Sequence, residues 1–140
     1  MNPVTSPRTL LHTALQLDAA ASGAMGLLLL LAGGALADPL QLSEPLLRGA
    51  GLVLLPFAAA VAYVGTRATV PRGAARTIVV ANLLWVVGSA AVLTGVAPSS
   101  WPMPSPLGMA FVVVQALTVL GFAEAQWIGL RRTMRLAASA

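Results

Sequence analysis

The chain has 140 residues, of which 58% are hydrophobic and only 9% are charged, and its formal net charge is +4. A soluble domain carries about 25% charged residues, so this chain cannot cover itself with a hydrated surface. The composition therefore predicts an all-α protein that crosses a membrane several times.

The residue inventory excludes several kinds of chemistry. No cysteine is present, which excludes disulfides, thiol catalysis and iron–sulfur clusters. All eight basic residues are arginine, which excludes a lysine Schiff base and the lysine of a phosphate-binding loop. His12 is the only histidine, so one chain cannot supply two imidazoles to a zinc ion or a haem. We therefore predict no metal site, no cofactor and no nucleic-acid partner.

Four charge-poor intervals define the predicted membrane spans. They cover residues 19–37, 49–66, 77–97 and 107–130, and only Glu124 interrupts the last one. A helix needs about 20 apolar residues to cross the hydrocarbon core of a bilayer. We therefore predict a single transmembrane domain, 1–140, folded as a four-helix bundle in the lipid bilayer, with helices at about 7–37, 46–66, 74–97 and 106–132.

The start of the first helix has two interpretations. Ser6 can cap this helix, and Pro7 suits its first position. The alternative is a signal peptide, because the Ala-Leu-Ala sequence at 35–37 resembles a cleavage site after an apolar run. The region before that run is long and contains Asp18, which favours a retained helix.

The positions of the arginines predict the orientation. If the four helices alternate in direction, seven of the eight arginines fall on one side of the membrane and only Arg48 falls on the other. Lys and Arg concentrate in cytoplasmic loops. Both termini and the loop at 67–76 are therefore predicted to be cytoplasmic, and the loops at 38–48 and 98–106 to lie outside.

A shift of 64 residues aligns parts of the two halves of the chain. Asp18 then aligns with Asn82, and the segment 63–67 (YVGTR) aligns with 127–131 (WIGLR). A 2+2 parallel repeat predicts this pattern. Two unrelated helices that each end with an aromatic residue and an arginine at the same interface produce it as well.

Four polar residues are candidates for binding an ion, a proton or a solute. Tyr63, Asn82, Asp18 and Glu124 are all predicted within about 10 Å of the cytoplasmic interface, and they form one polar layer if their helix faces converge. Acids inside a membrane usually face a bundle interior or a wet cavity, and transporters use them to couple to protons. The alternative is a structural role, in which both acids pair with His12 or a nearby arginine and fix the helix register.

Small and amide side chains predict how the helices pack. Gln115 and Gln126 are expected to form interhelical hydrogen bonds. Pro56 lies in the middle of the second helix, where the missing N–H predicts a kink. The fourth helix also carries a ridge of small residues that permits close approach of another helix: Gly121, Ala125 and Gly129.

Three stretches of the sequence carry a resemblance. They are LLRGAGLVLLPFAAAVAYV at 46–64, VVANLLWVVGSAAVLTG at 79–95, and the segment 106–132 with PLGMAFVVVQAL and FAEAQWIGLRR. They resemble a group of uncharacterised small four-helix integral membrane proteins of high-GC bacteria. The resemblance covers most of the chain and implies a location in the bacterial inner membrane, without implying an activity.

Two functions are compatible with these features. The first is a homo-oligomeric transporter or channel-like protein, with the acidic and polar layer near the cytoplasmic face as its binding site. The second is a non-catalytic scaffold or regulatory subunit that binds a partner membrane protein through small-residue helix faces. An enzyme is not expected, because the sequence contains no catalytic triad, metal-ligand set or phosphate-binding loop.

Overall fold

The computed structural model describes residues 9–96 and 102–139, and within them the chain forms four α-helices. They are α1 (Leu10–Leu40), α2 (Glu44–Thr66), α3 (Arg72–Thr94) and α4 (Pro106–Ala138). The predicted all-helical class is confirmed. The helix ends agree with the predicted ones to within a few residues, except that α4 runs six residues past the expected 132. The predicted cap at Ser6 lies outside the described residues.

Side-chain caps explain where three of the helices begin. Thr9, Ser43 and Ser105 precede α1, α2 and α4, and each hydroxyl oxygen accepts a hydrogen bond from a backbone N–H in the first turn. Such caps satisfy N–H groups that have no partner inside the helix. Gln41 directly follows α1 and Gly95 directly follows α3, and both residues adopt the left-handed conformation, with φ of 50° and 69°.

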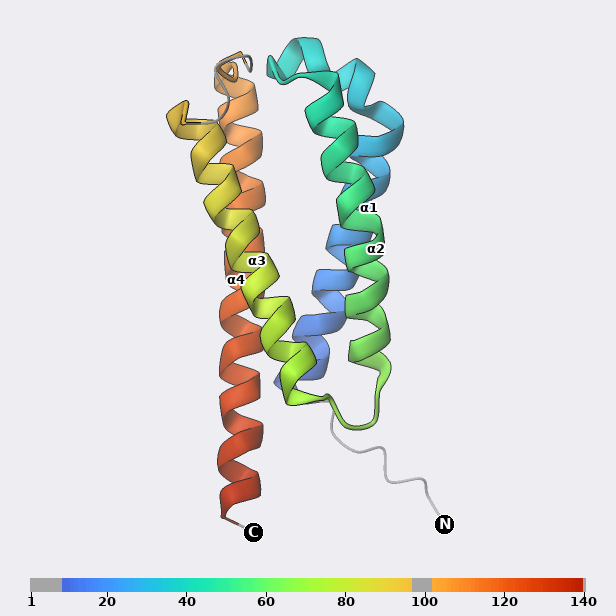
Figure 1. Ribbon diagram of the computed structural model, residues 1–140, viewed down its shortest axis with the longest axis vertical. Coiled ribbons are helices and arrows are strands. Elements are labelled where there is room, and N and C mark those ends of the chain that lie inside the picture. The colour runs from blue at the N-terminus through green and yellow to red at the C-terminus, as the bar shows by residue number, and fades with distance from the viewer. Residues whose placement is uncertain (1–8, 97–101, 140) are drawn as a thin grey trace.

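The four helices pack as two antiparallel hairpins, α1 with α2 and α3 with α4 (Figure 1). α1 also packs along α4, whereas α2 and α3 hardly touch. The α1/α2 hairpin is tight, because a Cβ added to Gly51 would lie only 2.7 Å from the carbonyl oxygen of Gly26. α2 remains helical through Pro56, so the kink at this residue stays a prediction.

One end of the bundle collects the arginines, and we call it the arginine end. It is formed by the start of α1, the end of α2, the start of α3 and the end of α4 (Figure 1). Of the seven arginines in the described part of the chain, only Arg48 lies at the other end. The six at the arginine end are Arg67, Arg72, Arg76, Arg131, Arg132 and Arg135.

The outer surface of the bundle suits a hydrocarbon solvent. All four helices are long and apolar enough to span a membrane, and less than a third of each span is buried within the chain. Large hydrophobic side chains such as Leu31, Leu84 and Leu117 are exposed on the outside. Soluble monomers rarely expose so much contiguous apolar surface, so the chain is a multi-pass membrane protein.

Candidate functional site

Asp18 of α1 is the centre of a buried polar network. Its side chain is fully buried, with 0% of its surface exposed. Ser22 lies one turn further along α1, and its hydroxyl donates to Asp18 Oδ1 at 2.9 Å. The other carboxylate oxygen, Oδ2, faces the second hairpin.

The second hairpin supplies two amide donors to this single oxygen atom. Asn82 Nδ2 of α3 and Gln126 Nε2 of α4 each donate to Asp18 Oδ2 at 2.7 Å. Asn82 Nδ2 also donates to Gln126 Oε1 at 3.2 Å. Asn82 and Gln126 are 2% and 0% exposed, so the network lies entirely inside the protein. We call Asp18, Ser22, Asn82 and Gln126 the Asp18 network.

The Asp18 network satisfies a carboxylate with neutral groups alone. Two amides and one hydroxyl donate to the two oxygens, and no cationic side chain in the described part of the chain forms an ion pair with Asp18. Burying a charge is costly unless it is paired and hydrogen-bonded. The three short hydrogen bonds offset part of that cost, and the negative charge itself stays uncompensated.

The two other candidates do not join this network. Glu124 lies on the outer face of α4 and is exposed, and within the described residues it has no hydrogen-bond or ion-pair partner. Tyr63 is 62% exposed on α2, and its hydroxyl oxygen accepts a 2.8 Å hydrogen bond from Arg67. Glu124 lies two residues before Gln126, which is about 200° away around a helix with 3.6 residues per turn. Because Gln126 faces Asp18, Glu124 faces away from it.

In both of the aligned segments, 63–67 and 127–131, the arginine contacts the aromatic residue four positions before it. The Arg67 guanidinium lies 5.2 Å from the centre of the Tyr63 ring, and that of Arg131 lies 5.4 Å from the Trp127 ring. Both distances are within the range of a cation–π contact. The hairpins themselves are not packed symmetrically, because α1 contacts α4 extensively while α2 barely contacts α3.

The small-residue ridge of α4 divides between the inside and the outside of the chain. A Cβ added to Gly129 would lie 2.7 Å from the backbone nitrogen of Leu11, so Gly129 permits close contact with α1. Gly121 lies on the outer face, and no atom of the described residues lies within 4 Å of its Cβ position. Ala125 is half-buried between them.

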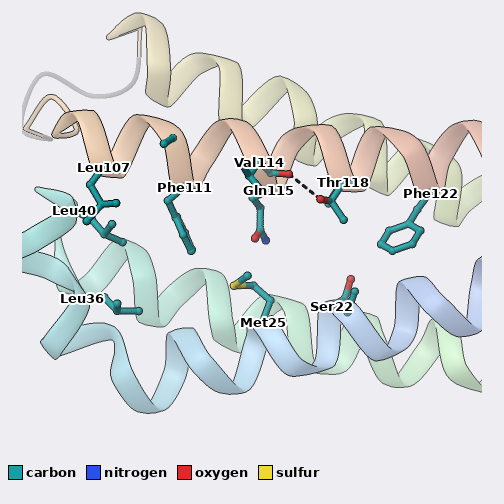
Figure 2. Close-up of a pocket in the computed structure, with 13 residues that line it drawn as sticks. Ser22, Met25, Leu36, Leu40, Leu107, Phe111, Val114, Gln115, Thr118 and Phe122 are labelled. Carbon is teal, nitrogen blue, oxygen red and sulfur yellow. Dashed lines mark hydrogen bonds between the residues drawn. The ribbon is translucent and has the colours of Figure 1, made fainter.

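A half-open cavity of about 520 Å³ lies next to the Asp18 network, between α1 and α4 (Figure 2). Ser22 belongs to both, because it lines the cavity and donates to Asp18. Phe122 lies across from Ser22 at this end, and Leu40 and Leu107 lie at the other. Cavities of 300–1,000 Å³ are typical of small-molecule sites.

Sequence reasoning missed two features of this site. Ser22 was not among the candidate residues, although its i+4 spacing from Asp18 was a signal for a hydrogen bond along the helix. The interhelical bond of Gln126 is confirmed, but its partner was not foreseen. Gln115 has no hydrogen-bond partner within the described residues, so the interhelical bond expected for it is absent from the structure. No sequence signal indicated the cavity.

The fold and the site together define a small four-helix membrane protein with a buried acidic network between two helical hairpins. No protein-family model matches the chain, and neither the curated proteins nor the solved structures contain a significant match to it.

Proposed function

We propose that this protein is a small membrane transport protein in which Asp18 binds the transported or coupling proton or cation. The observation that carries this proposal is the bonding of Asp18 Oδ2. A single carboxylate oxygen on the first hairpin accepts both amide donors of the second hairpin, from Asn82 and Gln126. Any ligand of this oxygen therefore competes directly with the contact that joins the hairpins.

A proton on Asp18 changes the hydrogen-bonding balance of the network. The ionised carboxylate only accepts hydrogen bonds, whereas the protonated acid also carries one donor. If the proton is on Oδ2, it opposes the two amide N–H donors, and at least one of them must release the oxygen. Binding of a cation to the same oxygen has an equivalent effect. Occupancy of Asp18 thereby weakens the link between α1 and the second hairpin.

The packing of the hairpins permits a movement that follows this change. The hairpins are joined along α1 and α4, while α2 and α3 make few contacts across the gap. Transporters commonly alternate access by rocking one helical unit against another around a fixed site. We propose that the α1/α2 and α3/α4 hairpins rock in this way, in a homo-oligomer whose arginine end faces the cytoplasm of a bacterial inner membrane.

The test is flux of protons and monovalent cations in proteoliposomes, with wild-type protein beside Asp18→Asn. Asparagine keeps an acceptor oxygen for Asn82 and Gln126 and removes the charge. We expect the variant to fold and insert as the wild type does and to lose flux by about a hundredfold, because the group that binds the ion is gone.

Glu124→Gln provides the control for this experiment. Glu124 lies outside the network on the exposed face of α4, so its neutralisation should leave flux within about twofold of wild type. Loss of flux in Glu124→Gln with normal flux in Asp18→Asn would contradict the proposal and move the pathway to the outer face of α4. Absence of flux in the wild type under any imposed gradient would contradict it as well.

A second candidate function is assembly through the outer face of α4. Two observations favour it: Gly121 is open to the outside, with nothing within 4 Å of its Cβ position, and the Glu124 carboxylate beside it has no partner in the described chain. An unpaired acid facing lipid is costly, and a neighbouring protein surface would cover it. In this case the Asp18 network serves only to hold the hairpins together.

The oligomeric state of a Gly121→Leu variant tests this second function. Gly88 on α3 is equally open, with nothing within 4 Å, so Gly88→Leu is the matched control. If α4 forms the interface, native mass spectrometry should show Gly121→Leu shifted to a smaller species, with Gly88→Leu unchanged. An identical distribution in wild type and both variants would exclude this face as the interface.

A further inference from the structure

The cavity between α1 and α4 is bounded at both ends by close helix contacts. At one end a Cβ on Gly108 would overlap the carbonyl oxygen of Leu40, and Ser105 N–H donates to the same oxygen at 3.0 Å. At the other end Gly129 packs on the backbone of Leu11. The Asp18–Gln126 hydrogen bond also joins the helices near Gly129, and the cavity lies between this bond and the Gly108 contact (Figure 2).

The dimensions of the cavity fit one extended chain. Its α4 wall runs from Leu107 to Phe122, about 22 Å at 1.5 Å per residue. The cavity volume is about 520 Å³. A cavity of this length and volume has room for an extended hydrocarbon chain.

The lining is mostly apolar. Leu36, Leu40, Leu107 and Phe111 surround the half nearer the α1–α2 turn. The other half is also largely apolar and contains the amide of Gln115 and the hydroxyl of Ser22, which already donates to Asp18. Gln115 therefore provides a polar contact in a mostly apolar cavity.

Gln115 is the polar side chain of the cavity that a ligand would stabilise most. Its side chain extends from α4 into the space between the helices (Figure 2), and the amide has no hydrogen-bond partner within the described part of the chain. An amide without a partner in an apolar environment costs several kcal/mol. A ligand with a hydrogen-bonding head beside Gln115 would remove that cost.

We propose that this cavity binds a single-chain amphiphile with an uncharged hydrogen-bonding head. The head lies at Gln115 and Ser22, and the chain lies along Phe111 toward Leu40 and Leu107. The ligand enters sideways from the bilayer, because α1 and α4 are in close contact at both ends and the cavity is half-open between them. This binding site does not depend on Asp18 carrying a transported ion.

A diazirine-bearing dodecanol is the probe for this site, used with the full chain in phosphatidylcholine nanodiscs. We expect photolabelling to concentrate on Met25 and Phe111, the cavity side chains on either side of the proposed chain. Excess dodecanol should reduce the labelling, and dodecane should compete about fivefold less well, because it lacks the hydrogen bond to Gln115. In Gln115→Leu the two competitors should become equivalent.

Ala110→Phe keeps the helix and fills the cavity, because Ala110 lines it. This variant should lose at least about nine-tenths of the Met25 labelling. Ala60→Phe, on the exposed face of α2, is the matched control and should label as the wild type does. Labelling spread evenly over all four helices and unchanged by Ala110→Phe would overturn the proposal, since it would mean contact with bulk lipid only. Equal competition by dodecane and dodecanol in the wild type would overturn the assignment of the head to Gln115.

Discussion

Asp18→Leu is expected to lower the free energy of unfolding by about 2–6 kcal/mol, whereas Asp18→Asn should leave it unchanged or raise it. Leucine removes the acceptor and leaves one buried N–H of Asn82 and one of Gln126 unsatisfied, at about 1–3 kcal/mol each. Asparagine can present its oxygen to both amides and turn its own amide toward Ser22. The Ser22 hydroxyl can then accept instead of donate.

Asn at position 18 also removes a buried charge that has no cation beside it in the described chain. A buried charge without a counter-ion is destabilising, which is why the variant is expected to match or exceed the wild type. The measurement is equilibrium unfolding in mixed micelles, followed by circular dichroism. Ser22→Ala is the reference variant for the loss of a single hydrogen bond of the network, which should lower the free energy of unfolding by only about 1 kcal/mol.

The comparison of these two variants distinguishes the effect of the acceptor oxygen on stability from the effect of side-chain volume. If Asp18→Asn and Asp18→Leu unfold alike, the acceptor oxygen is not what holds the hairpins together. The mechanism proposed for transport would then lose its basis, because it requires that Oδ2 link the first hairpin to the second.

Gly129→Ala and Gly121→Ala are expected to change stability in opposite directions although both glycines lie on α4. A Cβ at 129 would meet the backbone of Leu11 at 2.7–2.9 Å, so α1 and α4 must separate. Overpacking of this kind costs about 1–3 kcal/mol. A Cβ at 121 meets nothing, and replacing glycine by alanine inside a helix gains about 0.5–1 kcal/mol.

The same unfolding measurement checks both glycine variants, and cross-linking of α1 to α4 reports whether the helices have moved apart. A cysteine pair can be introduced for this purpose, because the natural chain contains no cysteine. Equal stability of the two variants would mean that the α1–α4 contact at Leu11 does not constrain the bundle.

Several features were predictable because they depend on composition and on spacing along one helix. Charge-free intervals of about 20 residues located all four helices. The alternation of helices collected six of the described arginines at one end. The cation–π pairs of Arg67 and Arg131 each lie within a single turn of helix, so their spacing was visible in the sequence.

The polar layer shows where sequence reasoning reached its limit. Position along a helix follows from counting residues at a fixed rise per residue, and Asp18 and Asn82 do contact each other, with a hydrogen bond of 2.7 Å. The direction in which a side chain points depends on how each helix is rotated against its neighbours. That rotation turned Gln126 toward Asp18 and left Glu124, two residues away, on the outside.

The membrane class, the number of helices, their alternation and the position of each polar residue along its helix were predictable, because these follow from local hydropathy and the geometry of one helix. The link between one oxygen of Asp18 and the second hairpin, and the cavity between α1 and α4, come from the tertiary structure. Both depend on which helices approach closely. Backbone contacts of Gly108 with Leu40 and of Gly129 with Leu11 determine that approach between residues 68 and 118 positions apart in the chain, and no local pattern specifies which surface each glycine will meet.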